Sequence, residues 1–427
     1  MKISVLIPTF NRAKFLQYTL DSCVSQQATD VEFVVCDDES TDDTEQVVQR
    51  YSVRDSRIKY IRQPKNVGML RNFEIGLSHC KNEYIFALGA DDALMPGSIS
   101  TMLKILASTQ CDLLTWPTGA FFYPGTRDSH GQLVFPVGKM DKSLAWIKSS
   151  EFLSRQSKNL HYVSDEDCPM IYVKGVASRK IIERVIGRSN GKFYSCSTPD
   201  GYSGIVLAGE VNQYVKYNFP LTMHGVSPSS AGVNYISSVS KNSDLSNKFF
   251  DDVLKRPMHK DLGSVEYSPL ISLMTADFLL TARDLPGWSG HFHEICYKNL
   301  INKALLEVAD GLMSEVKVKR ELLIIKAIAN HTSEIDYFNR AVRKIKRNSR
   351  KNLQGNAVSP RLIYLQGDQL DLDNVYQATY VLMAILNLRN VISWRRFIAM
   401  IGNSIQYYLR SKLRKNALTT YLSEEVD

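Results

Sequence analysis

The chain has 427 residues, of which 44% are apolar and 22% charged, and its formal net charge is +8. This composition excludes a disordered chain, a collagen-like fibre and a small disulfide-stabilised protein, and the length allows two or three domains. The mildly basic balance favours phosphate groups or anionic lipid as partners without identifying either.

The seven cysteines are scattered along the chain, and no two of them form a Cys-x-x-Cys pair. This pattern favours a reducing compartment over a zinc ribbon or a disulfide framework. The apolar run at the N-terminus is too short for a signal peptide, and no stretch reaches the ~20 apolar residues of a membrane-spanning helix. We therefore expect a cytoplasmic protein, and peripheral attachment to the inner face of the cell membrane stays open.

Strand-like and helix-like segments alternate four times in the first hundred residues. The predicted strands cover residues 3–7, 31–36, 58–61 and 84–88, and each is followed by a segment with helical spacing of apolar residues. This alternation is typical of an open, mostly parallel α/β sheet. Ligands of such sheets bind beyond the carboxyl ends of the strands.

Three polar clusters, at residues 8–12, 37–38 and 91–92, fall at the ends of predicted strands. The sequence has neither a G-x-G-x-x-G after the first strand nor a P-loop, which argues against the two corresponding nucleotide-binding folds. Two adjacent carboxylates at a strand end suit a hard divalent cation, which commonly takes one or two carboxylates plus substrate phosphates. Asp92 would then bind the metal and Asp91 a ribose hydroxyl. The plain alternative is that the pair caps the following helix.

Four motifs follow one another in the chain: Val5-Leu6-Ile7-Pro8-Thr9-Phe10-Asn11-Arg12, the segment from Val34 to Thr44 around Asp37-Asp38, Asn66-Val67-Gly68 with Arg71-Asn72, and Ala90-Asp91-Asp92. In order and spacing they resemble an inverting family 2 glycosyltransferase of the GT-A fold, of the bacterial surface-polysaccharide type. Ala90-Asp91-Asp92 stands in the place of the family's D-x-D. The resemblance covers about the first 110 residues and thins towards residue 235. It departs at Gly89-Ala90, where many relatives carry a further acidic residue.

The resemblance implies a role for each matched residue. Asp38 would accept a hydrogen bond from the base, most often uracil, and Asp91 and Asp92 would bind the ribose and a Mn²⁺ or Mg²⁺ ion. The other matched residues would lie along the nucleotide or its phosphates: Pro8, Thr9, Asn11, Arg12, Asn66 and Arg71. Plain alternatives exist for two of them, a helix N-cap for Asn11 and a surface charge for Arg71.

An inverting transfer needs a general base for the acceptor hydroxyl, and a carboxylate can supply it. Two acidic candidates lie downstream, Asp200 and the cluster at residues 165–167, with a predicted helix over 177–186 between them. In the family, the base begins a helix after a G-x-F-type strand. Asp200, which follows Pro199 and the Gly-Lys-Phe segment at 191–193, matches this context better. A capping carboxylate is the plain alternative for Asp200.

His224 follows the strand that we predict at residues 214–219. Many enzymes of the GT-A fold supply a late histidine that completes the metal site or contacts the diphosphate, and His224 is the candidate here. An ordinary loop histidine is the alternative. Ser227, Ser229 and Ser230 would then form a loop over the phosphates.

Composition changes near residue 236, where helical periodicity replaces strand-like runs. We therefore predict a GT-A domain over residues 1–235 and a mainly helical C-terminal domain over 236–427, with the linker at 237–247. No acidic residue occurs between 374 and 423, and apolar residues recur there at helical spacing from Trp394 to Leu409. A basic amphipathic helix suits an anionic membrane surface, although it could instead pack on the catalytic domain. No motif supports nucleic-acid binding.

These features predict a metal-dependent inverting glycosyltransferase. By resemblance it would move a sugar from a nucleotide-diphosphate sugar, UDP-linked by expectation, to a saccharide or a lipid-linked oligosaccharide, as in O-antigen or capsule assembly. Two alternatives stay open. One is a sugar nucleotidyltransferase, which would want a Gly-rich loop with Arg or Lys after the first strand that is absent here. The other is a catalytically inactive nucleotide-sugar-binding protein of the same fold.

Overall fold

The structure is a computed structural model that describes residues 1–126, 130–136, 140–230, 256–310, 313–345, 357–358 and 362–391. The predicted linker and the boundary at residue 235 lie outside these ranges, as does the basic tail from residue 392 onward. Within the ranges, no helix has the length and apolar character needed to cross a membrane.

The described helices follow the predicted order closely. They are α1 (Ala13–Val24), α2 (Thr44–Ser52), α3 (Met69–His79), α4 (Ser98–Thr109), α5 (Ser149–Asn159), α6 (Arg179–Arg188), α7 (Pro199–Ala208), α10 (Ile271–Arg283), α11 (Tyr297–Ala309), α12 (Glu315–His331), α13 (Ile335–Lys344) and α14 (Val375–Val391). The short 3-10 helices are η1 (Tyr162–Ser164), η2 (Lys260–Leu262) and η3 (Asp368–Leu370).

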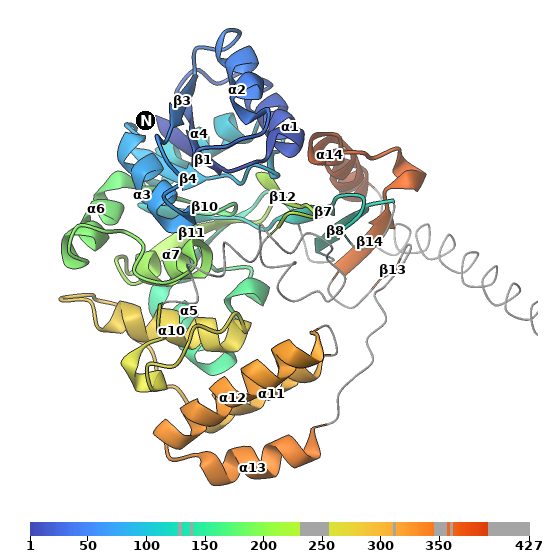
Figure 1. The fold of residues 1–427 in the computed structure, drawn as a ribbon. Coiled ribbons are helices and arrows are strands. Elements are labelled where there is room, and N and C mark those ends of the chain that lie inside the picture. The colour runs from blue at the N-terminus through green and yellow to red at the C-terminus, as the bar shows by residue number, and fades with distance from the viewer. Residues whose placement is uncertain are drawn as a thin grey trace, which may run out of the picture.

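The main sheet has the strand order β3-β2-β1-β4-β10-β6-β11-β9 (Figure 1). Its strands are β1 (Ile3–Thr9), β2 (Val31–Asp37), β3 (Ile58–Arg62), β4 (Tyr84–Ala87), β6 (Leu113–Thr115), β9 (Leu144–Lys148), β10 (Gly175–Ser178) and β11 (Gln213–Tyr217). The first four strands are parallel, as predicted. By contrast, β10 runs antiparallel to β4 and β6. The prediction of a helix from residue 177 was wrong by two residues, because β10 occupies them first.

Helices cover both faces of this sheet, which explains why its first strands are apolar along their whole length. Leu6 and Val34 point into the core that contains residues of α3, α6 and α7. Val5, Ile7 and Phe33 point into the opposite core, with residues of α1, α2 and α4. All five side chains are at most 1% exposed. The strands are therefore rigid supports for the loops at their ends.

A second sheet has the order β13-β14-β8-β7-β12-β5 and combines strands from both halves of the chain. Its strands are β5 (Ala93–Leu94), β7 (Gly119–Phe122), β8 (Gln132–Pro136), β12 (Thr222–Val226), β13 (Ala357–Val358) and β14 (Leu362–Gln366). The C-terminal strand β14 pairs antiparallel with β8, and α14 packs against α1, β5, β7 and β12 (Figure 1). Residues 357–358 and 362–391 thus pack with the N-terminal half.

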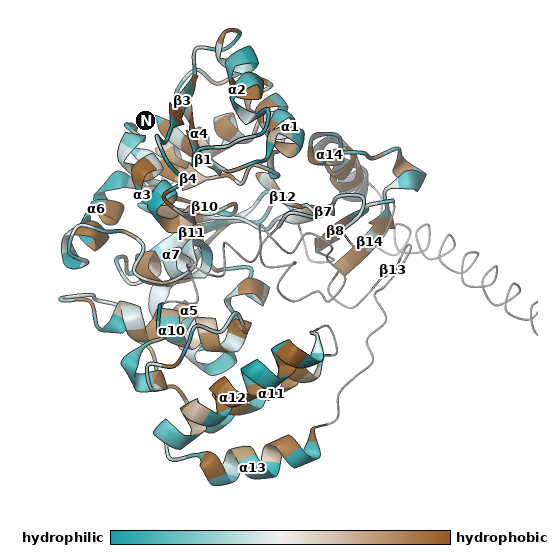
Figure 2. Cartoon of the chain, in the orientation of Figure 1, coloured by the Kyte–Doolittle hydropathy of each residue, from teal (hydrophilic) through white to brown (hydrophobic). Residues whose placement is uncertain are grey.

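The predicted helical character of the second half is confirmed by α10 to α14, although β13 and β14 were not expected. The helix predicted over residues 295–330 is two helices, α11 and α12. Helix α10 packs on α7 and α5, while α11, α12 and α13 pack on one another (Figure 1). Each of these three carries both apolar and polar residues, and their apolar residues continue the core beneath α7 (Figure 2). The division into two domains at residue 235 stays a prediction.

Asp277 on α10 provides a stability test of this packing. The carboxyl is 5% exposed and accepts a hydrogen bond from the His259 backbone N–H at 2.6 Å. Burial raises its pKa from 3.8 to about 6. The folded protein therefore binds this proton more tightly than the unfolded chain, and raising the pH through about 6 removes stability. At ~1.4 kcal/mol per pKa unit, the loss amounts to about 3 kcal/mol.

We expect Asp277→Asn, which keeps the acceptor oxygen, to raise the thermal midpoint above that of wild type at pH 8. At pH 4 the wild-type carboxyl is protonated in the folded state, so the two midpoints should converge. Thermal unfolding of both proteins between pH 4 and 8 measures the difference. A gap that does not change with pH would contradict the assignment.

Candidate active site

The carboxyl ends of β1 and β2 bring the first two polar clusters together. Thr9 pairs with Asp37 in the parallel register, so the loops that follow lie at one edge of the sheet. Asp38 is 3% exposed, and its carboxylate accepts hydrogen bonds from the backbone N–H groups of Val67 at 2.7 Å and Gly68 at 3.0 Å. Burial raises the pKa of Asp38, although these two N–H groups oppose the effect. The amide of Asn66 donates to the Asp38 carbonyl at 3.0 Å.

Asn11 orders the loop that follows β2. It adopts a positive φ of 52°, and its Oδ1 accepts a hydrogen bond from the Thr41 backbone N–H at 2.8 Å. Its own N–H donates to Ser40 Oγ at 2.8 Å. The alternative that Asn11 is the N-cap of α1 is wrong, because Arg12 occupies that position and makes no side-chain cap. Asn11 therefore fixes the loop at Ser40 and Thr41, which directly follows Asp38.

The other residues of the first motif differ in their surroundings. Pro8 lies within β1 and is paired with Cys36. Thr9 is 4% exposed, and its hydroxyl has no hydrogen-bond partner among the described residues. Arg71 is exposed on the surface of α3. Of these residues, Thr9 is the one with an unused polar group at the edge of the sheet.

Asp92 is fully buried at the turn after β4. Its Oδ1 accepts hydrogen bonds from the Gly225 N–H at 2.7 Å and from His224 Nδ1 at 2.9 Å, and its Oδ2 accepts one from the Gly89 N–H at 2.7 Å. A Cβ on Gly89 would lie 2.5 Å from the Tyr172 hydroxyl and 2.6 Å from Asp92 Oδ2. The space that Asp92 needs thus explains why no larger residue stands at position 89.

Asp91 is in contact with the loop that follows β12. Its Oδ2 accepts hydrogen bonds from Ser227 Oγ at 2.7 Å and Ser230 Oγ at 3.1 Å. The guanidinium of Arg12 donates to Ser227 Oγ at 3.1 Å and to the Ser229 carbonyl at 2.6 Å. Asp91, the predicted ribose-binding residue, and Arg12 of the first motif therefore both contact the loop at residues 227–230.

Asp92 and His224 have the chemistry of a divalent-metal pair. Burial lowers the pKa of His224, but the charges of Asp92 and Asp91 outweigh it and raise the pKa to about 9. The imidazole Nδ1 donates to Asp92, and a metal held by both side chains would have to displace this hydrogen bond. Among the described residues, no three His, Cys, Asp or Glu side chains form a metal-binding group. The pair fits an ion that takes its other ligands from substrate phosphates and water, as Mg²⁺ commonly does.

Asp200 lies in the first turn of α7, directly after Pro199. Its Oδ2 accepts a hydrogen bond from the Tyr162 hydroxyl at 3.2 Å. Its Oδ1 is buried and has no hydrogen-bond partner in the part of the chain that the structure describes. A buried carboxylate oxygen without a partner is uncommon, and Oδ1 therefore keeps an unused capacity to accept a hydrogen bond.

The charge of Asp200 reaches the same groups as the charges of Asp91 and Asp92. All three carboxylates raise the pKa of His224, whose burial alone would lower it. Burial raises the pKa of Tyr172 well above its ordinary value, and the same three carboxylates add to that shift. The charge of the predicted base therefore acts on the imidazole of the predicted metal pair.

The alternative acidic cluster at residues 165–167 is engaged in ion pairs. Arg155 contacts Asp165 at 3.3 Å and Asp167 at 2.6 Å. Lys216 contacts Asp167 at 2.8 Å and Glu166 at 3.4 Å. Each of these carboxylates has a cationic partner, whereas Asp200 has none among the described residues. The structure therefore favours Asp200 as the available base.

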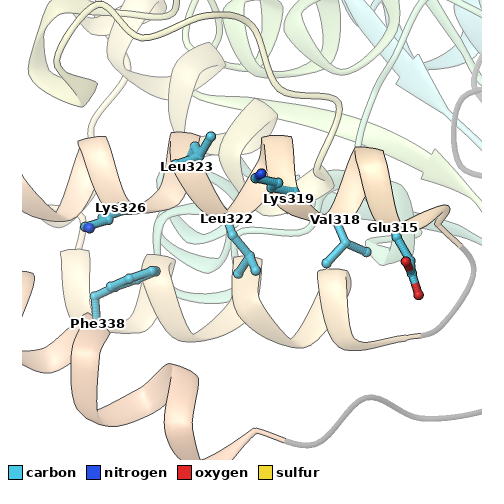
Figure 3. Close-up of a pocket in the computed structure, with 7 residues that line it drawn as sticks. All are labelled: Glu315, Val318, Lys319, Leu322, Leu323, Lys326 and Phe338. Atoms are coloured by element: carbon cyan, nitrogen blue, oxygen red, sulfur yellow. The ribbon is translucent and has the colours of Figure 1, made fainter.

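A groove lies away from these residues, between α12 and α13 (Figure 3). It has a volume of about 280 Å³ and is lined by apolar side chains such as Leu322 and Phe338, with Lys319 and Lys326 beside them. None of the predicted site residues contributes to it. The groove therefore does not compete with the sheet edge as the catalytic site.

Gly225 tests the geometry of the Asp91-Asp92 turn. A Cβ at this position would lie 1.6 Å from the Asp91 carbonyl oxygen, so Gly225→Ala must move β12 away from the turn. We expect a stability loss of about 1–3 kcal/mol, typical of overpacking, together with loss of metal-dependent nucleotide binding. Gly187→Ala on α6 is the control, because a Cβ there meets nothing within 4 Å. Thermal unfolding and calorimetry with UDP measure both effects, and unchanged nucleotide binding by Gly225→Ala would contradict the site.

Residues 4–176 match the family model described as "Glycosyl transferase family 2". The chain is 39% identical over 104 residues to the GalNAc(5)-diNAcBac-PP-undecaprenol beta-1,3-glucosyltransferase of Campylobacter jejuni, a match that covers 24% of this chain and 34% of that protein. It is 34% identical over 116 residues to the abequosyltransferase RfbV of Salmonella typhimurium, covering 26% of this chain and 34% of that one.

The chain thus spans about a third of the length of these curated relatives. Among solved structures, TarS from S. aureus in complex with UDP is 18% identical, with a TM-score of 0.45. That match covers 85% of this chain and 96% of the TarS chain.

Proposed function

We propose that this chain, whose residues 4–176 match the glycosyl transferase family 2 model, transfers a sugar from a nucleotide-diphosphate sugar to a saccharide acceptor with inversion at the anomeric carbon. The proposal rests on the Asp92–His224 hydrogen bond after β4, supported by the buried Asp38 carboxylate after β2 and by Asp200, whose charge acts on His224. Each of these groups suits one part of the reaction.

Asp200 would act as the general base. Its unpartnered Oδ1 takes the proton of an acceptor hydroxyl while that oxygen forms a bond to the anomeric carbon. The bond from the anomeric carbon to the donor phosphate breaks at the same time, and the nucleoside diphosphate leaves with the bonding electrons. Asp92 and His224 would hold a Mn²⁺ or Mg²⁺ ion, whose chemistry is to neutralise the diphosphate charge.

The donor proposed is UDP-linked. Asp38 accepts one backbone N–H on each carboxylate oxygen, and each oxygen keeps a further lone pair for a donor such as the N3–H of uracil. Asp91 suits a ribose hydroxyl, because it already accepts hydrogen bonds from two serine hydroxyls. Arg12 is joined to Asp91 through Ser227 and suits a phosphate.

The acceptor proposed is a saccharide or a lipid-linked oligosaccharide of surface polysaccharide assembly. The name of the Campylobacter relative specifies a PP-undecaprenol acceptor, and the extension to this chain is by analogy. Attachment at the cytoplasmic face of a membrane would then rest on the basic tail. Deleting residues 392–427 leaves α14 intact, and it should abolish co-sedimentation with anionic vesicles if the tail binds lipid. Unchanged co-sedimentation would leave the tail as a packing element.

Calorimetric titration of the full chain with UDP, GDP and CDP, with and without Mn²⁺, tests the proposal. We expect UDP to bind, and Mn²⁺ to increase its affinity. A preference for GDP or CDP would keep the enzyme class and change the donor. If no nucleotide binds, the transferase proposal fails. Release of pyrophosphate instead of UDP during turnover would indicate a nucleotidyltransferase.

A further inference from the structure

We propose that Tyr162 is a positioning residue for Asp200: its hydroxyl holds one carboxylate oxygen, so that the other is presented unbonded to the acceptor. The catalytic meaning of this contact rests on the function proposed above, but the contact itself does not. Tyr162 comes from η1, and nothing in the local sequence marks it as part of a site.

The contact is asymmetric with respect to the two oxygens of Asp200. The Tyr162 hydroxyl donates to Oδ2 at 3.2 Å, whereas Oδ1 is buried and has no partner among the described residues. A buried carboxylate oxygen without a hydrogen bond is costly, so a substrate hydroxyl that donates to it would be bound favourably. Tyr162 thus decides which oxygen is left for the substrate.

The ring of Tyr162 is held in place from two sides. A Cβ on Gly201 would lie 2.7 Å from the Tyr162 ring, so the glycine that follows Asp200 lets the ring approach the first turn of α7. On the other side, the ring packs against Phe278 of α10, with 5.5 Å between the centroids. The backbone N–H of Tyr162 also donates to Thr275 Oγ1 at 3.4 Å. Helix α10 of the C-terminal half therefore supports the base through Tyr162.

The hydroxyl acts as a donor at any ordinary pH. Burial raises the pKa of Tyr162 well above its usual range, and the charge of Asp200 raises it further. A hydrogen bond to the charged form of a carboxyl group stabilises that form. The other titratable groups on which the Asp200 charge acts are Tyr172, Tyr194, Tyr267, Cys168 and His224. None of these hydrogen-bonds Asp200 among the described contacts.

The test compares Tyr162→Phe with Tyr202→Phe in the full chain. Tyr202 packs against the same Phe278 ring, at 6.3 Å, but makes no described hydrogen bond to Asp200. Carboxyl NMR with ¹³C-labelled aspartate gives the midpoint of Asp200, assigned by the signal missing from Asp200→Asn. Tyr162→Phe should raise this midpoint by about half to one pH unit. The acidic limb of the plot of kcat against pH should shift by the same amount as this midpoint, and KM for the donor should stay unchanged.

Tyr202→Phe should shift neither the midpoint nor the limb. If Tyr162→Phe is too unstable to measure, Gly201→Ala is the second variant. Its Cβ would displace the Tyr162 ring, so it should also raise the titration midpoint of Asp200. An unshifted midpoint in a folded Tyr162→Phe protein would overturn the proposal, as would an equal shift in Tyr202→Phe. If wild type transfers no sugar, the proposed function fails, but the carboxyl titration still decides whether Tyr162 controls Asp200.

Discussion

An Asp200→Asn protein is expected to transfer sugar about 10²–10⁴-fold more slowly than wild type, the usual contribution of a positioned general base. The substitution keeps the shape of the side chain, and Asn can still accept the hydrogen bond that Tyr162 gives to Oδ2. What it removes is the basic oxygen, because an amide does not take a proton from an acceptor hydroxyl. We therefore expect kcat to fall while UDP binds with unchanged affinity.

Initial rates and calorimetry with UDP separate the two quantities. Glu166→Gln is the matched comparison, since Glu166 is the most exposed carboxylate of the alternative cluster, at 51%, and has only a 3.4 Å contact with Lys216. We expect this variant to retain its rate. Full turnover by Asp200→Asn would show that the base lies elsewhere, and a large loss in Glu166→Gln would point to the cluster at residues 165–167.

The parts of this site that the sequence predicts are those carried by local pattern. Asp38, Asp91 and Asp92 each follow a short apolar strand, and parallel strands place their carboxyl ends at a common edge. The helix start at Asp200 could be predicted because a Pro followed by an acidic residue is typical of one, whereas its role as base follows from the family resemblance and stays a proposal. In each case the signal lies within a few residues of the functional group.

The parts that could not be predicted depend on contacts between distant residues. The hydrogen bond from Tyr162 to Asp200 joins residues 38 positions apart, and that from Ser230 to Asp91 joins residues 139 apart. Strand β10 is only four residues long and lacks an alternating pattern, so the stronger helical periodicity after Ser178 masks it. Helix position could thus be predicted, but the assembly of the site from its loops could not.

The C-terminal half supports the site in two separate places. Helix α10 packs on α7, which carries Asp200, and α14 packs on β12, which carries His224. A helix from beyond residue 256 therefore packs behind each proposed role: α10 behind the proton acceptor on α7, and α14 behind the residue on β12 that would help to stabilise the leaving diphosphate. The family match ends at residue 176, so the roles proposed for Asp200 and His224 lie outside it.

Asp92→Asn is expected to abolish the increase in UDP affinity that Mn²⁺ produces. The carboxylate accepts from Gly225 and His224 on one oxygen and from Gly89 on the other. The side-chain amide NH₂ of the variant would stand in place of one of these oxygens. It would then face the N–H donors of Gly225 and His224, or that of Gly89, and could not accept their hydrogen bonds. We expect a stability cost of about 1–3 kcal/mol for the unsatisfied groups, besides the loss of the charged metal ligand.

Calorimetry with UDP, with and without Mn²⁺, measures the loss, and thermal unfolding measures the stability cost. Asp43→Asn is the control, because Asp43 is exposed at the N-cap of α2 and makes no side-chain cap. UDP should still bind to Asp92→Asn without metal, since Asp38 and its backbone partners are untouched. If Mn²⁺ still strengthens UDP binding in this variant, Asp92 is not the metal ligand. If metal-free binding is lost as well, Asp92 acts by holding the Gly89–Gly225 turn together and not by binding an ion.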